Sequence, residues 1–254
     1  MNEWNNSQNE RRMFRAIGSL YAQLDLGEIY APLKGLRYRF NFGPDFRYYR
    51  NGTFRNEESI SSEGKNRASL SNQSDFSWTL DNLIYYDKEF GKHSVGLTLL
   101  QSATGYHYEE SSMAAEGIPL ESAKWNALSK ENVSLLDEWN SGLIEKQLLS
   151  YMFRVNYNYD SKYYIGASIR YDGLSKLPKD TRWGTFWGAS AAWRLSREKF
   201  WTEAPVNEWF NDLRLRASYA TIGNSALGSD YPYLGTYGAK SVSYTHLRAH
   251  ETSA

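Results

Sequence analysis

Three alternating runs decide the fold, and they lie in residues 148–196, which read LLSYMFRVNYNYDSKYYIGASIRYDGLSKLPKDTRWGTFWGASAAWRLS. In the first run, the apolar residues Tyr151, Phe153 and Val155 alternate with polar residues such as Arg154 and Asn156. Successive side chains of a β-strand point to opposite faces, so each run would form a strand with one apolar and one polar face. The stretch therefore predicts consecutive β-strands.

The apolar face of each run has aromatic residues at its ends and small aliphatic residues in its middle. Transmembrane β-barrels place aromatic girdles at the two lipid-water interfaces in this way. We therefore predict that this face contacts outer-membrane lipid. The predicted girdle residues are Tyr151, Tyr159, Tyr163, Tyr171, Trp183, Trp187 and Trp193.

Similar runs occur on both sides of this stretch, and they bring the predicted total to eight strands. The flanking runs begin at Phe14, Leu36, Phe76, Val95 and Leu213. We expect the polar residues 45–66 and the residues 101–145 to form long loops. Within the second loop, Ser129 precedes residues 130–139, which read as a short capped helix. The expected fold is all-β, an antiparallel transmembrane β-barrel with a short helix in one long extracellular loop.

Composition excludes several classes of protein. The 29 basic and 29 acidic residues are mixed along the chain, which argues against a nucleic-acid partner. No acidic pair, Ser-His-Asp set or phosphate-binding loop has a supporting context, so we predict no enzyme, no catalytic residues and no cofactor. His107 near Glu109 and Glu110 lacks a second ligand motif, and cysteine is absent, so we also predict no metal site.

The two ends of the chain differ from the rest. The start at Met1 has neither the basic nor the apolar region of a signal peptide, and for an outer-membrane protein this leads us to expect a fragment. Residues 241–254 do not alternate and are similar to a translated sequencing-adaptor read-through. We therefore expect residues 1–240 to be a partial barrel and residues 241–254 to be a non-native tail.

Alternation alone leaves alternatives open, because a soluble barrel or sandwich has the same period. The polar face favours the membrane, since it is rich in Arg, Asn, Ser and Gly instead of mixed Lys and Glu. A one-residue slip in register would turn five arginines toward lipid, at a cost of up to about 10 kcal/mol. These arginines are Arg154, Arg170, Arg194, Arg214 and Arg216. The alternatives are a soluble carbohydrate-binding β-domain and a complete eight-stranded barrel that serves as an anchor or adhesin.

Three segments resemble the barrel of SusC/RagA-type TonB-dependent outer-membrane transporters, the nutrient importers of Bacteroidota. They are residues 154–163 (RVNYNYDSKY) leading to 170–173 (RYDG), residues 182–194 (RWGTFWGASAAWR), and residues 212–219 (DLRLRASY) followed by Gly223 and Asn224. The resemblance implies a barrel of about 22 strands, of which this chain supplies roughly a third. It places the protein in the outer membrane of a Gram-negative bacterium.

The resemblance also implies partners and a substrate. A SusD-like lipoprotein would act as a lid, TonB would supply energy through a segment absent here, and the substrate would be an oligosaccharide or a peptide. The long loop offers a candidate contact for the substrate or the lid, because aromatic rings stack on sugars and carboxylates bind hydroxyls. Its residues are Trp125, Trp139, Asp137 and Glu138. The competing interpretation is that the tryptophans only pack the loop against the barrel rim.

Overall fold

A computed structural model describes residues 6–60, 62–119, 121–129, 135–203 and 209–223. The predicted tail at residues 241–254 lies outside the described residues. The described strands are β1 (Ser7–Ile17), β2 (Leu20–Asp25), β3 (Leu36–Arg55), β4 (Arg67–Phe90), β5 (His93–Glu116), β6 (Leu135–Tyr159), β7 (Tyr163–Leu174), β8 (Trp183–Arg194) and β9 (Arg214–Ala220). The short helices are α2 (Leu26–Ile29), η1 (Ala31–Leu33), η2 (Glu121–Asn126), η3 (Lys179–Thr181), η4 (Leu195–Arg197) and α3 (Lys199–Thr202).

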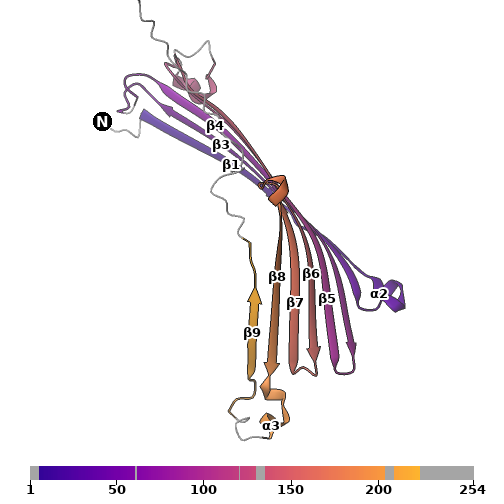
Figure 1. The fold of residues 1–254 in the computed structure, drawn as a ribbon. Coiled ribbons are helices and arrows are strands. Elements are labelled where there is room, and N and C mark those ends of the chain that lie inside the picture. The colour runs from indigo at the N-terminus through magenta and orange to yellow at the C-terminus, as the bar shows by residue number, and fades with distance from the viewer. Residues whose placement is uncertain (1–5, 61, 120, 130–134, 204–208, 224–254) are drawn as a thin grey trace, which may run out of the picture.

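The strands form one open antiparallel sheet in the order β1-β3-β4-β5-β6-β7-β8-β9, and β2 also pairs with β3 (Figure 1). The all-β, antiparallel prediction is thus confirmed. β1 and β2 follow β3 in a single register, since Ile17 pairs with Asp45 and Leu20 with Phe42. They separate beside Pro44, which has no N–H to donate, although its carbonyl accepts from the N–H of Gly18 at 2.9 Å. One predicted run therefore appears as two strands.

Four strands are much longer than predicted. β3 has 20 residues, β4 and β5 have 24 each, and β6 has 25, so strands take up half of the expected loop at 45–66 and more than half of the expected loop at 101–145. The predicted helix is wrong over Leu135–Trp139, which lies in β6, while residues 130–134 lie outside the described residues. The described helix in this connection is the 3-10 helix η2. The residues from Leu135 on form the strand β6 because they pair with β5.

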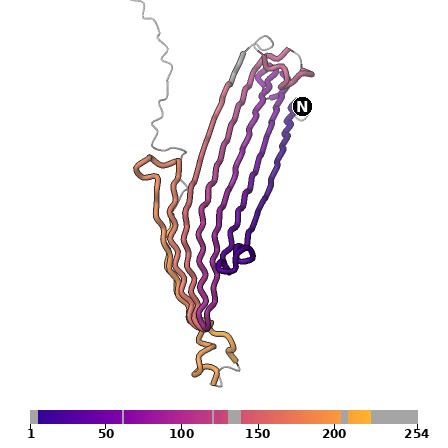
Figure 2. Tube along the Cα trace, turned by 90° about the vertical axis from the view of Figure 1, so that its right-hand side faces the viewer, coloured from indigo at the N-terminus to yellow at the C-terminus, as the bar shows by residue number. Residues whose placement is uncertain are grey.

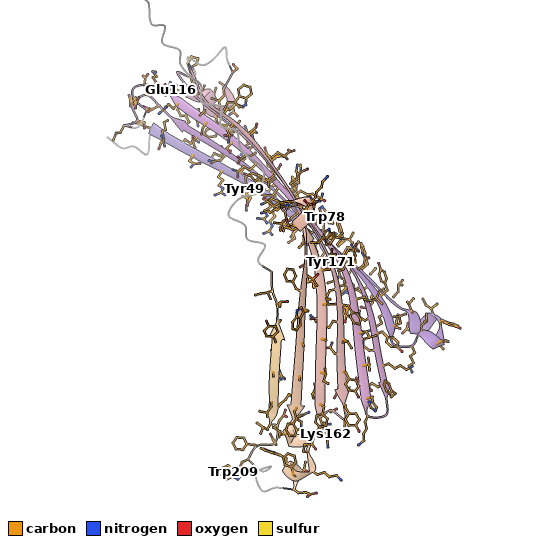
Figure 3. The ribbon with its side chains drawn as sticks, viewed as in Figure 1. Tyr49, Trp78, Glu116, Lys162, Tyr171 and Trp209 are labelled. Atoms are coloured by element: carbon orange, nitrogen blue, oxygen red, sulfur yellow. The ribbon has the colours of Figure 1, made fainter. Side chains whose placement is uncertain are left out.

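The strands differ in length, and Figure 2 shows long strands on one side of the sheet and short ones on the other. Register therefore divides the sheet into two parts along the strand direction. β7 ends where Leu174 pairs with Leu148 of β6. We call the strands beyond this level the extension, which comprises β1 and residues 44–55, 67–78, 105–116 and 135–147. We call the rest of the sheet the base, which comprises β2, β7, β8, β9 and the remaining residues of β3, β4, β5 and β6. In Figure 3, Glu116 marks the far end of the extension and Lys162 the far end of the base.

The sheet is a single layer, and its two faces differ. One face, the apolar face, carries Leu36, Ala167 and their partners on a single rung of paired residues. The polar face carries the intervening residues. The buried apolar residues of the described chain are few, and four of them form one small cluster in the extension, namely Phe54, Ala68, Ile118 and Trp125. Most large apolar side chains of the base are therefore open to the surroundings of the sheet.

The apolar residues form a band that runs obliquely across the rungs. Phe46 pairs with Phe76, and Phe76 pairs with His107, so this rung is apolar on β3 and β4 but polar on β5. Near the other end of β3, Leu36 is the first residue of its strand. Its rung nevertheless includes Ala167, which lies in the middle of β7. An apolar band of constant height crosses strands obliquely only when the strands are tilted, as in a transmembrane barrel.

At the lower end of Figure 1, two tight turns lie between two connections that contain short helices. The β4-β5 and β6-β7 turns occupy residues 91–92 and 160–162, whereas α2 and α3 lie in the connections after β2 and β8. Over the described residues, none of the helices has the length and apolar character required to span a membrane.

Candidate functional site

The polar face is the candidate functional surface, because alternation gathers most of the chemistry-bearing side chains of the sheet on it. Register places twelve arginines of the described strands on this face, including Arg11, Arg55 and Arg67 around the extension. The other nine are Arg15, Arg37, Arg39, Arg47, Arg154, Arg170, Arg194, Arg214 and Arg216. Their guanidinium groups offer planar sets of N–H donors that recognise carboxylates and other oxygen acceptors. The face can therefore bind polar or anionic groups.

Asp45 links two of these arginines. Its carboxylate accepts from Arg15 Nε at 2.9 Å and Arg15 Nη2 at 2.8 Å, and from Arg47 Nη2 at 3.3 Å. β1 supplies Arg15, and β3 supplies the other two residues. One carboxylate thus faces two guanidinium groups, which leaves the cluster with net positive charge. The sequence prediction missed this cluster, because it assigned Asp45 to a loop.

A hollow of about 550 Å³ lies beside this cluster on the polar face of the extension. Arg11 lies over the ring of Tyr49, with 5.3 Å from the guanidinium carbon to the ring centroid. Asn51, Ser71 and Gln73 add hydroxyl and amide groups to the lining. Such a combination of an aromatic ring with amide, hydroxyl and guanidinium groups can bind the polar groups of a sugar or of a peptide backbone.

A second hollow of about 610 Å³ lies on the polar face of the base. Asn156, Asn158, Arg214 and Arg216 are among its lining residues, and Arg214 stacks over Tyr164 at 5.0 Å. Within the described part of the chain, Asn158 Oδ1 and Arg214 Nε are buried and have no hydrogen-bond partner. This hollow therefore has free hydrogen-bonding capacity for a polar group.

On the apolar face, three of the predicted girdle residues form a row at the lower end of the base. Tyr159 lies 6.3 Å from Tyr163, and Tyr163 lies 6.4 Å from Trp193, measured between ring centroids. Glu198, which lies in the connection after β8, is hydrogen-bonded to two residues of this row. It accepts from the Tyr163 hydroxyl at 2.6 Å, from Trp193 Nε1 at 3.2 Å and from Lys162 Nζ at 3.3 Å.

These hydrogen bonds, of which the one from Tyr163 has the largest effect, hold the pKa of the Glu198 carboxyl below its ordinary value. The alternation of the strands gave no signal for Glu198, because the residue lies outside them.

Three more predicted girdle residues form a second row at the upper end of the base. Trp183 stacks on Tyr171 with 4.7 Å between ring centroids and lies 6.5 Å from Tyr151. The ring of Trp183 also covers Gly173, where an added Cβ would lie 2.7 Å from the ring. The rows are eight residues apart on β7, which corresponds to about 27 Å along a strand. Trp187 lies between the rows, 5.4 Å from Tyr219.

The candidate loop residues do not come together as one site. Trp125 is only 6% exposed, because its ring packs on Gly52 within the small cluster of the extension. Trp139 is 80% exposed and lies on β6 beside Met113, on the same side of the sheet as the apolar face. Asp137 and Glu138 belong to β6, and their side chains lie outside the described residues. Contact of these residues with a substrate or a lid stays a prediction.

Among the residues with described positions, neither face brings together a catalytic constellation. His107 hydrogen-bonds Glu109 and Glu145, each at 3.0 Å, across β5 and β6. In the part of the chain that the structure describes, no group of three or more His, Cys, Asp or Glu residues could hold a metal ion. The chemistry available is that of a binding surface.

Comparisons with known proteins give consistent matches, although no protein-family model matches the chain. TonB-dependent receptor P26 of Formosa agariphila is 30% identical over 219 residues, which cover 83% of this chain and 21% of that protein. TonB-dependent receptor SusC of Bacteroides thetaiotaomicron is 27% identical over 211 residues, which cover 79% of this chain and 20% of that protein. The chain thus spans about a fifth of the length of these relatives.

Solved structures give the same match at the level of the fold. The structure of the RagAB peptide importer in the open-open state matches 88% of this chain and 24% of that chain, with a TM-score of 0.77 and 23% identity. In the closed-closed state, the same importer matches 87% of this chain with a TM-score of 0.73. The open sheet therefore corresponds to part of a barrel wall.

Proposed function

Because this chain belongs to the SusC/RagA-type TonB-dependent receptors of the outer membrane, a family of transporters and not of enzymes, we propose that it forms part of the wall of a nutrient importer. The observation that carries this proposal is the division of one sheet into two faces. The apolar face has an aromatic row at each end of the base and belongs against lipid. The polar face belongs toward the lumen.

The polar face supports a role in passage of a solute. Its arginines lie on strands that are hydrogen-bonded into one sheet, so their positions are fixed relative to one another. The two hollows on this face lie in the extension and in the base, and both are lined mainly by polar groups. A polar solute that moves along the wall would therefore exchange hydrogen bonds with water for hydrogen bonds with the wall.

We propose the partners and the substrate class from the family. A SusD-like lipoprotein covers the intact receptor, TonB supplies the energy, and the cargo is an oligosaccharide or a peptide. The RagAB relative is a peptide importer, which favours neither cargo for this chain at 23% identity. The polar face contains both aromatic rings and guanidinium groups, so it suits either cargo.

The two alternatives account less well for the sheet. A complete eight-stranded barrel would require its first and last strands to pair, whereas β1 and β9 are the edges of the described sheet. A soluble β-domain would have to cover the large apolar side chains of the base, and the small buried cluster lies in the extension instead.

The test is disruption of the gene for the intact receptor in its source bacterium. Cells would be grown on oligosaccharides or on peptides as the sole carbon source, and uptake of labelled substrate would be measured. We expect loss of uptake for one of the two classes, restored by the intact gene and abolished again when TonB is removed. Unchanged uptake of both classes would contradict the proposed function.

A further inference from the structure

Three polar side chains interrupt the apolar band of the base. Asn82 of β4 pairs with Gln101 of β5. Tyr38 of β3 lies on the same face and pairs with Ile84, which is two residues after Asn82 on β4. Asn82 is flanked along β4 on the same face by Leu80 and Ile84. The cluster therefore lies within the apolar band and not at the polar end of the extension.

Hydrogen bonding within the cluster leaves donors unused. The Tyr38 hydroxyl donates to Asn82 Oδ1 at 2.6 Å, and Asn82 Nδ2 donates to Gln101 Oε1 at 2.6 Å. One hydroxyl and two amide groups hold five hydrogens that can be donated, and these two bonds use two of them. In the part of the chain that the structure describes, the other three, all amide N–H groups, have no partner. Reversing both amides together leaves the number of unused donors at three, whereas reversing one alone breaks a hydrogen bond and raises it to four.

Unpaired amide donors are costly against hydrocarbon, because no water is present there to accept from them. They therefore call for a ligand that brings acceptors. The ligand need not bring donors, since an acceptor alone satisfies an N–H group.

A groove on the apolar face adjoins the cluster and measures about 380 Å³. Its lining continues from Asn82 and Gln101 over Leu99 and Phe153 to Tyr151 and Tyr171. The last two residues belong to the upper aromatic row, and the Gln101-Tyr151-Tyr171 rung connects that row directly to the cluster. The groove thus leads from the expected lipid-water interface into the apolar band.

We propose that this groove binds one lipid molecule, with an acyl chain along Leu99 and Phe153 and an ester or amide carbonyl that accepts from the side chains of Gln101 and Asn82. A flexible acyl chain can fill a narrow groove, whereas a neighbouring barrel presents a convex wall that cannot enter it. A lipid carbonyl also brings an acceptor without a donor. The inference rests on the proposed function only in requiring the apolar face to contact the membrane.

The experiment compares the intact receptor with its N82L/Q101L variant after purification in mild detergent. Native mass spectrometry would count bound lipids, and added palmitoyl-oleoyl phosphatidylethanolamine would be titrated as the probe. We expect the wild type to retain one more lipid than the variant and to bind the probe at least about fivefold more tightly. The variant should fold normally, because leucine is favourable on this face.

The matched control is Asn72→Leu, which removes the similar Tyr48-Asn72 hydrogen bond of 3.1 Å in the extension and should leave lipid binding unchanged. Equal lipid retention by the wild type and the double variant would overturn the inference. A photo-crosslinker at position 99 that captures a polypeptide instead of lipid would also overturn it. If the wild type were absent from the outer membrane, the proposed function itself would fail, which fractionation would reveal separately.

Discussion

The base and the extension share the long strands β3, β4, β5 and β6, yet they are stabilised differently. In the base, aromatic and aliphatic side chains cover one face, and aromatic rows such as Tyr171-Trp183 lie at its limits. In the extension, the same face passes into polar residues such as His107 and Glu109, and a small cluster around Trp125 provides the burial. In the proposed arrangement, the base obtains its apolar contacts from the membrane, whereas the extension has to supply its own.

This difference shows that alternation reports the surroundings of a strand and not only its secondary structure. A strand between lipid and a wet lumen alternates strongly. The same strand in water on both sides has no reason to alternate, although its hydrogen-bond ladder continues in one register, as it does from Ala103 to Ala114 along β5.

The largest expected effect is on the cluster of the extension. Trp125→Ala removes the largest buried side chain of this cluster and should lower the free energy of local unfolding there by about 3–5 kcal/mol. Hydrogen exchange of the intact receptor would measure it as faster exchange at the ends of β3 and β4. Trp139→Ala is the control, since its exposed ring should leave exchange unchanged. Equal effects of the two changes would mean that the cluster does not stabilise the extension.

A charge on the apolar face should separate base from extension directly. Ala167→Arg places a guanidinium group near the middle of the apolar band, at a cost of about 2–4 kcal/mol, and should strongly reduce the amount of receptor in the outer membrane. Ser168→Arg, on the polar face, should be tolerated. Ser111→Arg, which is on the side of the apolar face but in the extension, should also be tolerated. If all three variants assembled alike, the assignment of the faces would be wrong.

The upper aromatic row should contribute a smaller energy. A double-mutant cycle with Tyr171→Ala and Trp183→Ala should give a coupling of about 0.5–1.5 kcal/mol, because the rings stack at 4.7 Å. Urea unfolding of the receptor refolded in lipid vesicles would measure it. A coupling near zero would show that the residues contact lipid independently instead of acting as a pair.

The smallest effect concerns Glu198 at the lower row. Because hydrogen bonds lower the pKa of Glu198, its contribution to stability should be complete above its unfolded pKa of about 4.3 and should be lost as the pH falls through the lower, folded pKa. Melting temperatures of the wild type and Glu198→Gln should therefore differ at pH 6 and converge at lower pH. Glu203→Gln, at an exposed residue of the same connection, serves as the control. A constant difference at all pH values would contradict this role.

Much of the base could be predicted from the sequence, because lipid on one side imposes a period that single residues reveal. The faces of Tyr151, Tyr163 and Trp193 follow directly from that period, and so do the turns at residues 91–92 and 160–162. The interruption at Asn82 was also visible, although its partners Tyr38 and Gln101 were not, because register joins residues that are far apart in the chain.

The extension could not be predicted in the same way. Residues 135–139 favour a helix by local signals, but pairing with β5 makes them a strand. The burial of Trp125 depends on its meeting Gly52, which is 73 positions away in the chain, and Glu198 depends on the approach of a connection to two strand ends. These are tertiary contacts, and no local pattern encodes them.

The slope of the oblique apolar band has a consequence for strands outside this chain. In a closed barrel, the tilt of the strands and their number together fix the shear and hence the radius. If a neighbouring strand continued the apolar band with a different register, its apolar residues would not line up with those of this wall. The surface that faces the bilayer would then be interrupted. The incline between Leu36 and Ala167 therefore carries information about the circumference of the whole cylinder.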